Sequence, residues 1–164
     1  MDAHVTSWNK NASINVRTDV AMMCKFGFDI SMDELTKDEQ LYCQDAVVNY
    51  KRLKKVILDG DMYRLVSPYE ENHTSVMYVD ENKSKAVLYA YDIFPRYGEK
   101  LLKVKMQGLD PAKKYKVEEI SLMPNTESRL SSNGKIYSGD YLMKIGLDVF
   151  TGAKLNSRVI ELTV

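Results

Sequence analysis

The sequence predicts an α+β fold, in which a short N-terminal helical segment is followed by an antiparallel β-sandwich. Apolar residues recur at helical spacing in the first third of the chain, and the period changes to two after it. The segment Asp59–Asp61, with Gly60 at its centre, separates the two patterns. We therefore expect two units, a helical unit over residues 1–58 and a sandwich domain over residues 59–164.

Two helices are expected before this boundary. Thr18 can cap a helix over Asp19–Lys25, and Gly27 suits its end. The residues Val20–Met23 are apolar on every side of that helix, so we expect them to be buried. Thr36-Lys-Asp-Glu39 has the form of a capping box, in which each terminal side chain binds the backbone amide of the other residue. The longer helix that follows has one apolar stripe, made of Tyr42, Cys43, Ala46, Val47, Tyr50 and Leu53.

The second pattern consists of short β-rich runs separated by turn residues. A polar turn at Asp80–Lys83 joins two of these runs into a hairpin, and Asn133-Gly134 is a strong turn signal. Runs of this length and spacing favour two facing antiparallel sheets, which could fold alone. The expected strands are 62–67, Val76–Val79, Ala86–Ile93, Leu101–Met106, Lys114–Leu122, Lys135–Tyr137 and Ser157–Val164.

Charge and composition argue against several classes of protein. Basic and acidic side chains number 23 each, and no basic stripe is present, so we expect no nucleic-acid partner. No apolar run approaches the roughly 20 residues that span a bilayer, and no signal peptide is recognisable, so we expect no membrane partner. The site of action in the cell stays unknown. Cys24 and Cys43 fall in the expected helices and are interpreted as free thiols rather than zinc ligands.

Few residues suggest chemistry of their own. Asp59 and Asp61 flank Gly60 and could pair their carboxylates, but turns favour Asp for backbone reasons. His4 lies in a polar segment with Trp8, and such side chains could contact a sugar, since an indole face stacks on apolar sugar faces. A single Trp is, however, more often a packing residue. No phosphate-binding or dinucleotide-binding motif occurs.

Three segments in order carry a resemblance to a known family. They are the run from Met1-Asp-Ala-His4-Val-Thr6 to Phe26-Gly-Phe-Asp29, the stretch Asp59-Gly-Asp-Met-Tyr63-Arg64-Leu-Val-Ser67-Pro68, and Ser138-Gly139-x-Tyr141-Leu142-Met143. Together they resemble the C-terminal end of an α-galactosidase of glycoside hydrolase family 36. Asp2 and Trp8 depart from the residues that are frequent there.

This resemblance implies a division of roles along the chain. Residues 1–58 would be a remnant of a (β/α)8 catalytic barrel, and residues 59–164 the sandwich that packs against the barrel and stabilises it. The two catalytic aspartates of this retaining enzyme, which hydrolyses terminal α-galactosyl residues of oligosaccharides, would precede Met1. We therefore expect no catalytic residue, metal or cofactor here, with His4 and Trp8 next to the substrate.

The resemblance also bears on partners and setting. A galactoside would be bound only through the parent enzyme, which would be a cytoplasmic or periplasmic bacterial protein. Helices left uncovered by the missing part of the barrel would promote self-association of the chain.

Two other functions compete with this interpretation. One is a stand-alone carbohydrate-binding β-sandwich module, which would present several exposed aromatic side chains, whereas the only Trp lies outside the β half. The other is a small enzyme that uses Asp59 and Asp61. Sequence alone cannot bring those two carboxylates to the roughly 5–9.5 Å separation that glycoside hydrolysis requires.

Overall fold

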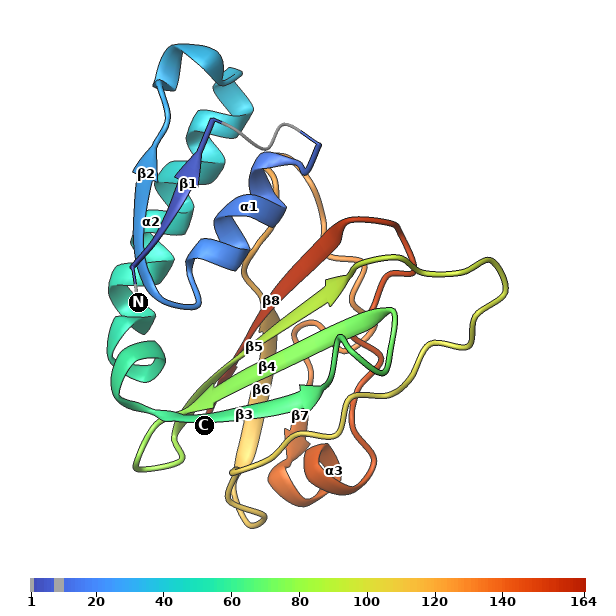
Figure 1. The fold of residues 1–164 in the computed structure, drawn as a ribbon. Helices are drawn as coiled ribbons and strands as arrows, with labels where there is room; N and C mark the ends of the chain where they lie inside the picture. The colour runs from blue at the N-terminus through green and yellow to red at the C-terminus, as the bar shows by residue number, and fades with distance from the viewer. Residues whose placement is uncertain (1, 8–10) are drawn as a thin grey trace.

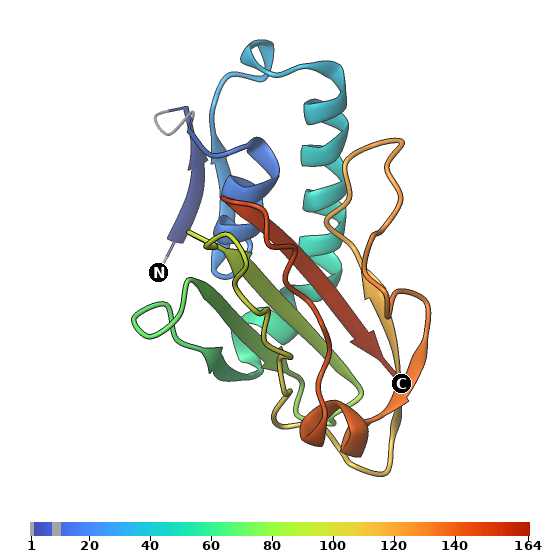
Figure 2. The same ribbon diagram turned by 90° about the vertical axis from the view of Figure 1, so that its right-hand side faces the viewer.

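The structure is a computed structural model that describes residues 2–7 and 11–164. It contains eight named strands, three α-helices and one short 3-10 helix within these residues. In chain order the elements are β1 (Asp2–Thr6), α1 (Ile14–Ala21), β2 (Lys25–Asp29), a 3-10 turn (Met32–Glu34), α2 (Lys37–Asp59), β3 (Asp61–Val66), β4 (His73–Val79), β5 (Lys85–Asp92), β6 (Lys114–Glu119), β7 (Ile136–Ser138), α3 (Gly139–Lys144) and β8 (Asn156–Thr163). The helical unit and α3 lie at opposite ends of the molecule (Figure 1 and Figure 2).

The main sheet is antiparallel and has six strands in the order β3-β4-β5-β8-β6-β7. The predicted α+β class and the antiparallel pairing are thus confirmed, whereas the six strands form one sheet in place of the two facing sheets that we expected. The hairpin of β4 and β5 also forms as expected, because the Asp80 carboxylate accepts the backbone amides of Ser84 and Lys85, each at 2.7 Å. The strand expected over Leu101–Met106 was wrong: only Val104 forms a bridge there, with Leu147. The rest of that segment packs on the sheet as a loop.

Both faces of the main sheet are covered, which explains why β5 is buried from Ala86 to Asp92. On one face Leu88 and Ile160 pack against loop residues and α3, including Leu142. On the other face Tyr89 packs against Leu53 and other residues of α2. Burial of apolar area on both sides is the main stabilising contribution in such a layer. The second layer of the sandwich is therefore made of loops and α3 on one side and of helices on the other.

Helix α2 begins and ends where the sequence predicts. The Glu39 amide donates to Thr36 Oγ1 at 3.3 Å, and the Thr36 amide donates to Glu39 Oε2 at 2.9 Å, which confirms the capping box. Gly60 follows the last helical residue because a Cβ there would lie 2.4 Å from the carbonyl oxygen of Val56 and 2.6 Å from that of Val79. The close approach lets the helix turn directly into β3.

The N-terminal part differs from the prediction. The first helix is Ile14–Ala21, not Asp19–Lys25, and Thr18 is buried inside it instead of capping it. Gly27 does not end a helix, since it lies within β2, and Cys24 precedes that strand. The reason is tertiary: residues 25–29 pair in parallel with β1, and this pairing overrides local helix preference.

The apolar run at the end of α1 is not buried on all sides as expected. Ala21 and Met22 are buried, whereas Val20 is 46% exposed. The unit thus alternates strand and helix, β1-α1-β2-α2, with β1 and β2 side by side (Figure 1).

Candidate functional site

The residues that the sequence singled out do not assemble into one site. His4 is exposed on β1, and its ring lies over Gly27 of β2, where an added Cβ would come within 2.9 Å of His4 Cδ2. Trp8 falls outside the described residues. The substrate contacts of His4 and Trp8 therefore stay a prediction.

Asp59 and Asp61 lie on the surface at the junction of α2 and β3. Both are exposed, and neither carboxylate forms a hydrogen bond or ion pair with any described residue. Asp59 lines a cleft of about 280 Å³ with Arg52 and Lys55, but Asp61 does not line it. The arrangement matches a helix end better than a pair of carboxylates that flank one substrate bond.

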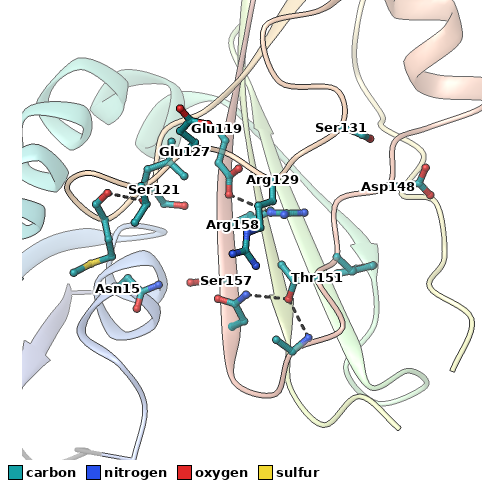
Figure 3. A pocket seen from close by; sticks show the side chains of 16 residues that line it. Asn15, Glu119, Ser121, Glu127, Arg129, Ser131, Asp148, Thr151, Ser157 and Arg158 are labelled. Carbon is teal, nitrogen blue, oxygen red and sulfur yellow. Dashed lines mark hydrogen bonds and ion pairs between the residues drawn. The ribbon is translucent and has the colours of Figure 1, made fainter. Parts of the chain in front are cut away.

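A polar cleft of about 540 Å³ lies where the helical unit meets the sheet (Figure 3). Asn15 of α1 contributes from one side. Residues 119–131, from the end of β6 onward, contribute a second wall, and residues 148–158, which include the start of β8, contribute the third. These segments are far apart in the sequence, so no local motif could reveal the cleft.

Arg158 of β8 forms the base of one wall. Its Nε donates to Glu119 Oε1 at 3.1 Å, and its Nη1 donates to the carbonyl oxygen of Val149 at 3.0 Å. The Ser128 hydroxyl donates to the other oxygen of Glu119. Arg158 is only 9% exposed, so a charge-assisted pair in a nearly dry setting fixes its guanidinium in place.

Thr151 is held by a second buried network. Its Oγ1 donates to Asp92 Oδ2 at 2.7 Å and accepts Asn156 Nδ2 at 2.9 Å. The other oxygen of Asp92 lies 2.8 Å from Nδ1 of the buried His73, whose ring packs against Phe150 with centroids 4.7 Å apart. Loop 150–156 is thereby tied to β4 and β5.

Directly behind the cleft, the fully buried Asp19 joins the helical unit to the sheet. Its carboxylate accepts Tyr42 OH from α2 and Ser157 Oγ from β8, each at 2.7 Å. Burial raises the pKa of this carboxyl from its ordinary 3.8 to about 7, although the hydroxyl donors oppose the shift. Tyr91 OH donates to the backbone carbonyl oxygen of Asp19 at 2.9 Å.

Sequence reasoning missed Asp19, Arg158 and Glu119. A weak signal was present, because Asp19 and Arg158 are charged residues next to β-branched apolar residues in the runs that fold into α1 and β8. A buried charged side chain needs a partner. A charge in such a run therefore indicates either a buried ion pair or hydrogen bond, or that the run was wrongly assigned as a buried element.

Among residues 2–7 and 11–164, no cluster of three or more His, Cys, Asp or Glu side chains is placed to hold a metal ion. Within the same ranges, no helix has the length and apolar character to cross a bilayer. Cys24 and Cys43 are free thiols.

Comparison with known proteins places this fold in a class of glycoside hydrolases. The structure superimposes on the crystal structure of the GH36 α-galactosidase AgaB from Geobacillus stearothermophilus with a TM-score of 0.84 and 27% identity, over 99% of this chain and 21% of that one. A variant of AgaA from the same organism in complex with stachyose gives a TM-score of 0.83 and 26% identity, over 99% of this chain and 22% of that chain.

Sequence comparison gives the same class and then the family. The chain is 26% identical to the probable α-galactosidase G of Aspergillus terreus over 99% of its own length and 21% of that protein. The model of the glycosyl hydrolase family 36 C-terminal domain matches residues 73–162. The chain belongs to glycoside hydrolase family 36, as its motifs predicted. It spans about a fifth of the length of these relatives.

Proposed function

We propose that this chain is the non-catalytic C-terminal portion of a retaining α-galactosidase that hydrolyses terminal α-galactosyl residues of oligosaccharides. The observation that carries the proposal is the parallel pairing of β1 with β2, with α1 between them and α2 after them. Parallel strands occur almost only in sheets covered on both faces, and a two-stranded sheet is marginal in water. Such a β-α-β-α unit suits part of a (β/α)8 barrel.

The proposed units keep the boundary predicted from sequence. Residues 1–58 would supply the last strands and helices of the barrel, and residues 59–164 the sandwich domain. The family match over residues 73–162 falls entirely in the second unit. No residue here matches either catalytic aspartate motif of the family, so the chemistry would come from residues that precede this segment.

The sandwich would stabilise the barrel through a shared core. Leu53 and Ile57 of α2 pack on Tyr89 of β5 in one apolar cluster. Two tyrosine hydroxyls of the sheet also hold the end of α1: Tyr91 OH donates to the carbonyl oxygen of Asp19, and Tyr78 OH donates to that of Met23 at 3.0 Å. These contacts fix the helical unit on the sheet, which supports a structural role for the domain.

Complementation tests the proposal. An AgaA polypeptide that lacks the region matched by this chain should have little activity on a chromogenic α-galactoside, and co-refolding with this chain should restore it. This chain alone should show no turnover. Turnover by the isolated chain that disappears in Asp59→Asn or Asp61→Asn would favour a small independent enzyme and refute the proposal. Leu53→Asp places a charge in the apolar cluster between α2 and the sheet, so this variant should fail to complement. The exposed Asp33→Asn should complement normally.

A further inference from the structure

We propose that the polar cleft between α1, residues 119–131 and residues 148–158 binds a neutral saccharide. The proposed function gives these cleft residues no role, and we assign them a ligand here. It rests on the geometry of the cleft and does not depend on catalysis elsewhere.

The first observation is that the polar walls are rigid before any ligand arrives. Glu119 and the carbonyl oxygen of Val149 hold Arg158, and Asp92 holds Thr151. Binding sites gain affinity when their polar groups are held in place by other partners, because less conformational entropy is lost on binding. Figure 3 shows the bond between Arg158 and Glu119 and the position of Thr151 in the wall of the cleft.

The second observation is that other side chains around the cleft have unused hydrogen-bonding capacity. The half-buried side chain of Asn15 and the exposed side chains of Glu127 and Arg129 line the cleft, yet none of the three forms a hydrogen bond or ion pair with any described residue. They come from two different walls and supply amide, carboxylate and guanidinium groups. A ligand with several hydroxyl groups could satisfy both the donors and the acceptors among them.

The third observation concerns charge and size, which select the class of ligand. The cleft is lined by the carboxylates of Glu119, Glu127 and Asp148 and by the guanidinium groups of Arg129 and Arg158, so an anion is disfavoured. Within the described ranges, the three carboxylates are not grouped closely enough to hold a metal ion, so a divalent cation is disfavoured as well.

A volume of about 540 Å³ falls in the usual range for small-molecule sites. The half-buried side chains of Leu122 and Met123 also line the cleft and supply apolar surface for the C–H face of a sugar ring. Mixed charge, amide and hydroxyl groups beside an apolar patch fit a neutral polyhydroxylated ligand better than a charged one.

Nuclear magnetic resonance titration of this chain with galactose, raffinose and stachyose tests the proposal. We expect saturable shifts of residues in the three walls with a Kd in the millimolar range, which corresponds to roughly −4 kcal/mol. Arg129→Ala and Asn15→Ala should each weaken binding about threefold to tenfold, the loss expected when one hydrogen bond to the ligand is removed. Neither side chain makes a contact that holds the fold, so thermal unfolding should be unchanged.

A control variant shows whether binding is specific to this cleft. Arg64→Ala on β3, which removes an exposed arginine remote from the cleft, should leave binding unchanged. Three results would overturn the proposal: no saturation at about 50 mM sugar, tighter binding of inorganic phosphate than of the sugars, or shifts confined to the loops that carry the exposed Tyr69 and Tyr97. The titration measures binding without turnover. Its outcome therefore does not depend on whether the chain restores activity in the complementation experiment.

Discussion

Asp19 gives the sharpest prediction, because a fully buried carboxyl between the helical unit and the sheet should make the free energy of unfolding depend on pH. We consider the substitution Asp19→Asn, which mimics the neutral acid and keeps its shape. In the folded protein burial raises the pKa of Asp19 from 3.8 to about 7. The folded state therefore keeps a proton between these two pH values, whereas the unfolded state has lost it.

The sign and size follow from proton linkage. When the folded state binds more protons, stability falls as pH rises. The contribution of Asp19 is fully present below about pH 3.8 and is lost as pH rises through about 7. At ~1.4 kcal/mol per pH unit, the whole interval corresponds to about 4 kcal/mol, of which about 3 kcal/mol falls between about pH 5 and about pH 8.

Urea unfolding, followed by circular dichroism near pH 5 and near pH 8, measures this difference. The free energy of unfolding of Asp19→Asn minus that of the wild type should increase by about 3 kcal/mol over that range. Asp33→Asn, at an exposed acid in the 3-10 turn, serves as a matched control and should show no such increase. A difference that stays constant, or that decreases with pH, would refute the reasoning about burial.

Three further predictions concern the contact between the helical unit and the sheet, the packing around Gly139, and the exposed surface of the helical unit. Tyr91→Phe removes the hydroxyl that donates to the carbonyl oxygen of Asp19 and should lower stability by about 1 kcal/mol in urea unfolding; the same change at the exposed Tyr97 should have no measurable effect. Gly139→Ala would place a Cβ 2.0 Å from the carbonyl oxygen of Asp110 and should cost about 3 kcal/mol, whereas Gly98→Ala, with open space around it, should cost only the roughly 1–2 kcal/mol of left-handed backbone. Exposed apolar side chains on the helical unit, including Val20 and Val48, should cause concentration-dependent self-association, which light scattering can measure. The double substitution Val20→Ser with Val48→Ser should reduce this self-association. A chain that stays monomeric at every concentration would contradict the idea of an uncovered helical unit.

The parts of the fold that could be read from sequence have strong local signals. The capping box at Thr36 and the stripe from Tyr42 to Leu53 specify α2 by themselves. The two β-rich runs and the polar turn Asp80–Lys83 specify the hairpin of β4 and β5. In these elements local preference and tertiary structure agree, so a short window of sequence is enough.

The parts that could not be read depend on distant pairing. Phe26 and Phe28 alternate around Gly27, but five residues of β2 are too few to outweigh the helical neighbourhood, and β1 is needed to make them a strand. The cleft is a similar case, since Asn15, Glu127 and Arg158 meet only in the folded chain. Buried charges such as Asp19 gain their environment from residues more than a hundred positions away, Ser157 among them.

The place of β8 in the main sheet has a consequence for how the protein is made. β8 follows every other strand along the chain, yet it lies between β5 and β6 in the middle of the sheet. While a ribosome synthesises the earlier strands, β5 and β6 each keep an open edge of unpaired amide and carbonyl groups, which can pair with another nascent chain. The sheet can close only after residues 156–163 have emerged, so its completion depends on contacts of long sequence separation, which form slowly. We expect chaperones that shield open strand edges to increase the yield of soluble protein more than any substitution on the surface of the finished fold.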